Sequence, residues 1–535
     1  MSTEVRRRSW WGWGWEDQAL SDAECATAGA RLGGLPSAPL PVPDLASIDL
    51  PQPRLRAPDS LGQIVSATPF DRASHTYGKS YRDVVRALRG DLATPPDLVA
   101  YPSSENDVVA LLDWAACVDA AVVPYGGGSS VVGGVSCPIG DFSGVVSIDM
   151  TRLDRVLEID TVSRAARIQA GALGPRIEEQ LRPAGYTLRH FPQSFEFSTL
   201  GGWLATRAGG HYATLHTHID DFVESMRVVT PIGISESWRL PGSGAGPSHD
   251  RLFLGSEGTL GIVTEAWMRL QDRPTHRRST TVSFTDARHA FGALRAIAQS
   301  GLYPANCRLL DPGEAGMSGA SSDGSWVLVL GVESHEHPVD TVIDQLIGIA
   351  REHSGTPAAP KGEHPPERDP AADTWRSSFL RMPYARDAMA RMSAIVETFE
   401  TAITWDRLES LHHDLTIEMA DVVRRVTGNE GLINCRITHV YPDGAAPYYT
   451  VIAAGRPGQE VDMWDEIKVA AMEILTRHRA TVTHHHAVGR DHRPGYDRQR
   501  SDIFATALAA TKHALDPSGM LNPGVLLPPR ATAGT

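Results

Sequence analysis

Three segments rich in glycine, serine and threonine could bind a long polar ligand through main-chain and hydroxyl groups. The first, residues 124–130, reads Pro-Tyr-Gly-Gly-Gly-Ser-Ser, and its glycines leave consecutive N–H groups free to meet phosphate oxygens. The others are residues 193–199, continued by 206–209, and residues 257–263. We interpret the first segment as the cradle of a nucleotide diphosphate and the others as contacts along the rest of the ligand. A flexible turn is the alternative for the first segment taken alone.

Several catalytic and nucleotide-binding motifs are missing from the sequence, and this narrows the classes of function. Residues 124–134 do not end in Gly-Lys-Ser/Thr, which excludes a P-loop, and they lack the GxGxxG spacing of a Rossmann turn. The chain contains no HExxH zinc motif and no GxSxG elbow of serine hydrolases. With 50 basic against 64 acidic side chains, the net charge is −14, so we expect no nucleic-acid partner.

Histidines form a run of three at 484–486. Imidazole can act as an acid–base group or as a metal ligand. If the run were a strand, the first and third rings would face one side and the second ring the other, so the three could not share one ion without a bulge. His216 and His218, close to two aspartates, keep a metal site open as an alternative, but we predict no metal.

The periodicity of hydrophobic residues predicts the helices and strands that position these residues. Apolar runs predict strands at 98–101, 121–125, 145–148, 156–159, 166–170 and 262–270. Helical spacing of apolar residues predicts helices at 104–116, 175–182, 385–427 and 498–515. A stretch rich in proline, glycine and charge predicts a mobile insertion at 354–374. We therefore predict an α+β protein in which a glycine-rich half holds a nucleotide and the other half covers it.

The 535-residue length predicts two or more domains, because one hydrophobic core does not grow to that size. Five dispersed cysteines without a CxxC pair predict neither a disulfide framework nor a zinc knuckle. The basic start, residues 1–8, has no apolar stretch after it, so we expect a cytoplasmic protein. Four tryptophans between residues 10 and 15 predict an arm packed onto a domain, with a membrane-surface foot as the alternative.

Several motifs together resemble the FAD enzymes of the vanillyl-alcohol-oxidase, or PCMH, type. They are the Pro-Tyr-Gly-Gly-Gly-Ser-Ser segment, Ser-Phe-Glu-Phe-Ser-Thr-Leu-Gly-Gly-Trp at 194–203, and Gly-Ser-Glu-Gly-Thr-Leu-Gly-Ile-Val-Thr-Glu at 255–265. Within that superfamily, the chain most resembles the alkyldihydroxyacetonephosphate synthase family. Asn-Cys-Arg-Ile-Thr at 434–438 and the histidine run with its following Ala-Val-Gly carry this narrower resemblance, which extends along nearly the whole chain.

The resemblance implies an N-terminal arm with helices at 1–93 and a two-part, PCMH-type FAD-binding domain at 94–273. It also implies an α+β cap (substrate) domain at 274–483 and a C-terminal segment at 484–535 that returns to the FAD domain. FAD is expected to be non-covalent, because no histidine lies in the first glycine segment. By position, the implied FAD contacts are Pro124, Tyr125, Gly126, Gly127, Gly128, Ser129, Ser130, Gln193, Ser194, Phe195, Glu196, Phe197, Ser198, Thr199, Thr206, Arg207, Ala208, Gly209, Glu257, Gly258, Thr259, Leu260, Gly261, Ile262 and Val263.

The resemblance also implies a reaction. An enzyme of this family exchanges the acyl group of acyl-dihydroxyacetone phosphate for a fatty alcohol, through an adduct at flavin N5 and without net redox change. Tyr448 matches the proton-transferring tyrosine, and Arg386 matches an arginine that binds the substrate. Arginines and protonated histidines nearby are expected to lower the pKa of the Tyr448 phenol. Other residues that match groups required for activity are His190, Arg308, His484, His485 and His486.

Other functions remain open at this point. An FAD oxidoreductase of a hydroxy acid or alcohol, of the D-lactate or glycolate type, is the main alternative. Relatives of that kind carry Glu-His-Gly where this chain has His-His-Ala at 485–487, which disfavours it. A flavin-holding protein without catalysis is a third reading, in which Tyr448 packs in a strand and the arginines form surface ion pairs.

The chain also departs from the family. The segment after Asp311 is shorter than in the animal enzymes, and Ala487 and Arg490 replace the usual glycine and lysine. We expect a lipid-like small-molecule substrate, a homodimer, and peripheral contact with a membrane as an alternative to a purely cytoplasmic protein.

Overall fold

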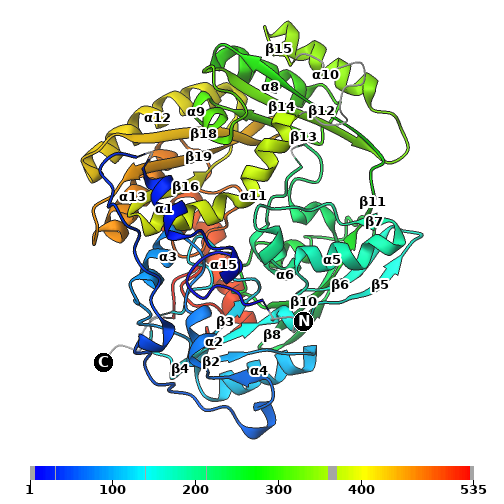
Figure 1. Ribbon diagram of the computed structural model, residues 1–535. Helices are drawn as coiled ribbons and strands as arrows, with labels where there is room; N and C mark the ends of the chain where they lie inside the picture. Colours follow the sequence, from blue (N-terminus) through cyan, green and yellow to red (C-terminus); the bar gives the residue numbers. More distant parts are fainter. Residues whose placement is uncertain (1–5, 31, 139, 213, 359–369, 531–535) are drawn as a thin grey trace, which may run out of the picture.

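The structure, a computed structural model, describes residues 6–530 except 31, 139, 213 and 359–369 (Figure 1). A small mixed sheet carries the first glycine segment. The sheet has the strand order β1 (Val65–Ser66), β2 (Leu98–Ala100), β4 (Gly144–Asp149) and β3 (Ala120–Tyr125), with β2, β4 and β3 parallel. Between β2 and β3 runs α4 (Glu105–Cys117), capped by Ser104 and Asp107 as predicted. The glycines therefore begin directly where β3 ends.

A second, antiparallel sheet carries the other two glycine segments. Its order is β5 (Val156–Asp160), β6 (Ala165–Gln169), β10 (Ile262–Arg269), β8 (Val223–Thr230) and β9 (Gly233–Glu236). Two helices, α5 (Gly174–Leu181) and α6 (Leu200–Thr206), pack apolar side chains against it. The second glycine segment ends at Thr199, the N-cap of α6, and the third runs into β10. Both segments are thus fixed at one end by regular structure.

A third sheet forms the cap (Figure 1). Its order is β15 (Thr356–Pro357), β12 (His276–Phe284), β14 (Trp326–Ser334), β13 (Asn306–Leu310), β18 (Gly431–Val440), β19 (Gly444–Ala454) and β16 (Ala394–Glu400), with β17 (Ile403–Thr404) paired to β19. One continuous core joins this sheet to α8 (Ala287–Gln299), α10 (Asp340–Glu352), α12 (Trp405–Thr427) and α13 (Glu460–Arg477). Nearer the cavity described below lie α9 (Pro312–Ser318) and α11 (Pro370–Arg391), which contact β18 and β16.

The two ends of the chain tie these sheets together. The N-terminal arm is packed by its aromatic side chains: Trp10, Trp11 and Trp13 are buried, which confirms the packed arm. The arm continues into α1 (Asp22–Gly29), which packs on α11. At the other end, Leu521 bridges to Val122 of β3, so the C-terminal segment returns to the first sheet. The other α-helices in the described residues are α2 (Pro69–Ser74), α3 (Tyr81–Leu88), α7 (Asp250–Phe253), α14 (Arg493–Gln499) and α15 (Asp502–Leu515).

The α+β class is confirmed, but two predicted helices are wrong. The helix predicted at 385–427 is two helices, α11 and α12, separated by β16 and β17, because the apolar run 394–399 pairs with β19 as a buried strand. The helix predicted at 498–515 breaks at Arg500, whose backbone is extended, and Ser501 caps the new helix α15. Of the insertion predicted at 354–374, residues 359–369 lie outside the described residues.

None of the helices in the described part of the chain combines the length and the apolar character needed to span a bilayer. All five cysteines are free, as their dispersion predicted.

Candidate active site

A large cavity of about 820 Å³ lies where the three sheets meet. The glycine segments line one side of it, and strands β16, β18 and β19 of the cap line the other, together with α1 and α11. Most of the predicted FAD contacts line this cavity. The exceptions are Phe195, Glu196, Phe197, Arg207, Thr259 and Leu260.

The first glycine segment has a shape that only glycine permits. A Cβ atom on Gly127 would lie 1.8 Å from the carbonyl oxygen of Phe197, and one on Gly126 would lie 2.3 Å from Oγ1 of Thr199. Gly128 has a φ of +69°, in the left-handed region that favours glycine. The first and second segments therefore touch through their main chains, which leaves a narrow, Cβ-free cradle of the kind that holds a diphosphate. The residues present fit FAD in this cavity.

Glu257 joins the third glycine segment to the chain that follows the histidine run. Its buried carboxylate accepts hydrogen bonds from the backbone N–H of Val488 at 2.9 Å and of Gly489 at 2.8 Å. Burial raises the pKa of Glu257 to about 7, although these two hydrogen bonds act against the rise. The side-chain amide of Asn522 also donates to the carbonyl oxygens of Gly134 and Glu257. The C-terminal segment thus closes the wall of the cavity.

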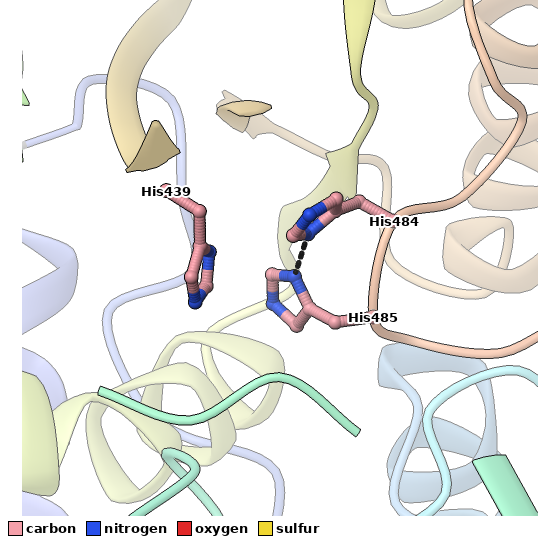
Figure 2. A group of neighbouring side chains, drawn as sticks. All are labelled: His439, His484 and His485. Carbon is pink, nitrogen blue, oxygen red and sulfur yellow. Dashed lines mark hydrogen bonds between the residues drawn. The ribbon is translucent and has the colours of Figure 1, made fainter. Parts of the chain in front are cut away.

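The histidine run lies in an irregular segment, so the strand that we considered for it is wrong. The carboxylate of Glu400, at the end of β16, accepts the backbone N–H of His485 at 3.1 Å and of His486 at 2.7 Å, and also that of His484. Three successive N–H groups converge on one carboxylate, which bends the chain. The rings of His484 and His485 consequently meet, with their Nδ1 atoms 2.9 Å apart (Figure 2).

The imidazoles of the run are neutral rather than protonated, contrary to our expectation. Burial lowers the pKa of His484 and His485 well below the usual value, and it lowers that of His486 to about 4. Burial raises the pKa of the Glu400 carboxyl, but the charge that His486 and His484 carry when protonated, together with the hydrogen bonds from Thr483 and from the backbone N–H of His486, lowers it by more, so that the net shift is downward. The negative charge of this cluster therefore resides on Glu400.

Tyr448 lies in the centre of a row across the cap sheet, between Arg436 of β18 and Glu400 of β16. The Arg436 guanidinium carbon is 3.9 Å from the centroid of the Tyr448 ring, and the same guanidinium bonds Glu314 at 2.6 Å. Burial raises the pKa of Tyr448, while the positive charge of Arg436 lowers it in part. The expected lowering of the Tyr448 pKa by an arginine is present, but the arginine is Arg436. Burial outweighs this effect, so the pKa is raised overall.

The two predicted arginines both reach the cavity. Arg308 of β13 is 2% exposed and donates to the carbonyl oxygen of His211 at 3.0 Å. Arg386 of α11 bonds Asp387 at 3.0 Å, and Asp387 in turn accepts the backbone N–H of Trp13 in the arm. The N-terminal arm therefore fixes the helix that presents Arg386.

The structure does not place every predicted catalytic residue at the cavity surface. His485, His486 and Tyr448 line the cavity, whereas His484 lies behind His485. His190 is 1% exposed, packs against Trp203, and has no hydrogen-bond partner for either ring nitrogen among the described residues. Burial lowers the pKa of His190 to about 3.

Five residues at the site were missed by the sequence analysis: Glu314, Glu400, Arg436, His439 and Tyr441. Arg436 stands inside the Asn-Cys-Arg-Ile-Thr motif and His439 directly follows it, so a signal for these two was present. Glu400 could not be found, because its strand was predicted as helix.

Family models match two parts of the chain: "FAD binding domain" at residues 96–235 and "FAD linked oxidases, C-terminal domain" at residues 273–526. Together with the glycine cradle, these matches define an FAD-dependent enzyme with a PCMH-type FAD-binding domain and an oxidase-type cap.

More specific relatives are alkyldihydroxyacetonephosphate synthases. That of Trypanosoma brucei brucei is 31% identical over 513 residues, covering 90% of this chain and 82% of the relative, and that of Dictyostelium discoideum is 32% identical, covering 85% and 77%. A solved alkyldihydroxyacetonephosphate synthase superposes with a TM-score of 0.81 at 26% identity, covering 98% of this chain and 99% of the other. The chain belongs to the alkyldihydroxyacetonephosphate synthase family.

Proposed function

We propose that this protein is an FAD-dependent alkyldihydroxyacetonephosphate synthase. It replaces the acyl group of acyl-dihydroxyacetone phosphate by a fatty alcohol and forms an ether bond. The observation that carries the proposal is that one cavity joins a flavin cradle, a buried tyrosine, two arginines and an apolar chamber. The cradle suits FAD, the arginines suit the phosphate, the tyrosine suits proton transfer, and the apolar chamber suits a fatty chain.

The arginines suit the phosphate end of the substrate. A guanidinium binds phosphate through paired, charge-assisted hydrogen bonds, and burial strengthens them. Arg386 lines the cavity beside its ion-pair partner Asp387, and the buried Arg308 lines it as well. We assign Arg386 to the phosphate and Arg308 to the polar groups next to it.

The cap sheet provides a gradient from polar to apolar along a single face. Four residues along the strands from the row of Arg436, Tyr448 and Glu400, a second row lies in the same register, formed by Leu432, Ile452 and Val396. These apolar side chains line the cavity, together with methionines of α11 and small residues of α1. A gradient over four residues spans about 13 Å. It gives a fatty chain an apolar place while its reactive end stays beside Tyr448.

Tyr448 is the residue we assign to proton transfer at the carbon next to the substrate carbonyl. Its hydroxyl belongs to a ring that lies under Arg436, whose positive charge favours the phenolate, the form that can accept the proton. FAD held in the glycine cradle would supply an electron-accepting ring system for this reaction. His485 and His486 flank the tyrosine, with ring centroids 6.1 and 5.4 Å from its own, and exclude water from this part of the cavity.

In this proposal, residues 94–273 form the domain that holds FAD, and residues 274–483 form the domain that covers the substrate. The N-terminal arm, 1–93, and the C-terminal segment, 484–535, pack against these two domains. We further propose that the protein is a cytoplasmic homodimer that takes its lipid substrates by peripheral contact with a membrane. Light scattering of the purified protein and co-sedimentation with vesicles of phosphatidylcholine test these two points.

Incubation of the purified yellow protein with acyl-dihydroxyacetone phosphate and labelled hexadecanol tests the function. We expect the label in an alkyl ether of dihydroxyacetone phosphate, together with one free fatty acid per ether, detected by mass spectrometry. Tyr448→Phe should reduce turnover by about 100-fold or more while the FAD content stays unchanged. Tyr449→Phe is the matched control, because that hydroxyl contacts His412 in the cap core.

Two results would contradict the proposal. One is a wild-type protein that forms no ether. The other is rapid bleaching of the flavin by D-lactate or glycolate without oxygen, which would favour the hydroxy-acid oxidoreductase instead.

A further inference from the structure

The proposed reaction, on which this inference rests, releases one proton inside a buried site. The ester carbon–oxygen bond breaks, the acyl group leaves as a carboxylate with both oxygens, and the alcohol oxygen bonds to the carbon. The alcohol O–H proton is left over, because a carboxylate does not carry it at neutral pH. Each turnover therefore requires that a proton leave the cavity.

A continuous chain of hydrogen bonds leads from the cavity to the surface beside the histidine run. His485 lines the cavity, and its Nδ1 lies 2.9 Å from Nδ1 of His484 (Figure 2). The other nitrogen of His484, Nε2, is 2.6 Å from the hydroxyl of Tyr441. That hydroxyl is 3.0 Å from Nε2 of His218, a half-buried ring. The same Nε2 also lies 3.2 Å from Nε2 of His484, a longer direct contact between the two rings. The last nitrogen, Nδ1 of His218, bonds the carbonyl oxygen of Arg207 at 3.0 Å.

The chemistry of neutral imidazole makes this chain able to move a proton. Each neutral ring has one N–H donor and one acceptor nitrogen. Because the carbonyl of Arg207 can only accept, neutral His218 carries its proton on Nδ1 and presents a lone pair at Nε2. The Tyr441 hydroxyl can donate its proton to that lone pair and accept another from His484.

We propose that His485, His484, Tyr441 and His218 form a proton relay that carries the alcohol proton from the cavity to solvent. A proton that arrives at Nε2 of His485 displaces the Nδ1 proton of that ring onto Nδ1 of His484. The Nε2 proton of His484 then moves to the Tyr441 oxygen, and the hydroxyl proton of Tyr441 moves to Nε2 of His218. The resulting imidazolium loses one proton to water, so the relay transfers one charge and changes no heavy-atom bond.

The relay ends in a place where water can take the proton. His218 and Tyr441 are both half-buried, and the residues next to Tyr441, Pro442 and Asp443, are exposed. The cavity end, in contrast, is formed by rings that burial keeps neutral, so a proton placed there is driven outward.

Metal binding is the alternative function for the histidines of this cluster. His439, His484 and His485 present nitrogens that all lie within 4.8 Å of one another (Figure 2). However, both nitrogens of His439 already have partners, the hydroxyl of Thr438 at 3.0 Å and the carbonyl of Gly210 at 2.8 Å. An ion would also have to break the bond between His484 and His485. The hydrogen-bonded relay keeps all these partners, so we favour it.

Two variants of the holoenzyme test the relay. Tyr441→Phe removes the hydroxyl and leaves only the longer contact of 3.2 Å between the Nε2 atoms of His484 and His218. We expect kcat to fall about tenfold with KM and FAD content unchanged. His218→Ala should lower kcat similarly, and added imidazole, which fits the half-exposed space left by the ring, should restore it. A purely structural defect would not respond to imidazole. Tyr449→Phe, a buried tyrosine also bonded to a histidine, is the control and should keep the wild-type kcat.

The outcomes separate this inference from the proposed function. A wild-type protein that forms no ether contradicts the function. An active wild type with a His218→Ala that keeps its kcat, or that stays slow with imidazole, overturns the relay alone. An unchanged Tyr441→Phe overturns the part of the Tyr441 hydroxyl in it. One tightly bound zinc ion per chain, measured by elemental analysis and lost in His439→Gln, would also overturn it.

Discussion

Glu400 gives the histidine run its shape. One buried carboxylate accepts the backbone N–H groups of three successive residues and the hydroxyl of Thr483 at 2.7 Å. Glutamine at this position would keep one oxygen, but it would turn an NH2 group toward N–H groups that can only donate. Each buried donor left without an acceptor costs about 1 to 3 kcal/mol.

Glu400→Gln should therefore lower the free energy of unfolding by about 2 to 4 kcal/mol, as measured by urea titration. Turnover should also fall, because His484 and His485 lose their mutual orientation. The exposed Glu158→Gln on β5 is the control and should change stability by less than about 0.5 kcal/mol. An equally small effect for Glu400→Gln would mean that the run keeps its shape without the carboxylate.

At the residue scale, the sequence predicts side-chain roles only where a motif carries them. Tyr448, His485 and the two arginines were found through the family resemblance, and all line the cavity. The electrostatic state was not predictable in the same way, since neutral histidines follow from burial and burial is a property of the fold. Ala487, where the family has glycine, has a φ of +72°, which the sequence could suggest but not establish.

At the scale of elements, the first glycine segment tolerates the least change in sequence, because its close contact with the second segment leaves no space for a Cβ atom at Gly127. Gly127→Ala would place a Cβ atom 1.8 Å from a main-chain carbonyl oxygen of the second segment, and main chain cannot move aside as a flexible side chain can. The two segments would separate and the cradle would widen. We expect Gly127→Ala to lose most of its bound FAD, measured as the ratio of visible to ultraviolet absorbance after gel filtration.

Gly348→Ala is the matched control for this change. Gly348 lies in α10, where a Cβ atom would meet nothing within 4 Å, so alanine there should keep FAD and favour the helix by about 0.5 to 1 kcal/mol. Full flavin content in Gly127→Ala would show that the close contact between the two segments is dispensable for the cofactor.

The elements of the FAD-binding part were predicted well, and those of the cap less well. Strands β2, β3 and β4 are short apolar runs bounded by turns, and the cap of α4 is a local signal. In contrast, β16 lies between two long helices, and its apolar run fits a helical pattern as readily as a strand. Only its pairing with β19, a contact far along the chain, decides between them.

At the scale of the whole molecule, folding buries many imidazoles and makes stability depend on pH. Burial lowers the pKa of His190, His412, His439, His484, His485, His486 and His492. Burial also raises the pKa of Glu257 and Asp311 to about 7, and these two carboxyls act with the opposite sign. A single histidine outside the cavity therefore gives the clearest measurement of the effect.

His412 of α12 is that histidine. It lies in the cap core among Phe291, Trp326 and Tyr449, and burial lowers its pKa to about 4. The unfolded chain, with a histidine pKa near 6.5, binds a proton that the folded protein does not, so stability is lost as pH falls below about 6.5.

Relative to His412→Gln, the wild type should lose about 2 kcal/mol of unfolding free energy between pH 7.5 and pH 5, measured by urea titration at each pH. A parallel loss in wild type and His412→Gln would mean that this imidazole is protonated inside the folded cap, and that its burial is less complete than the packing of the aromatic rings indicates.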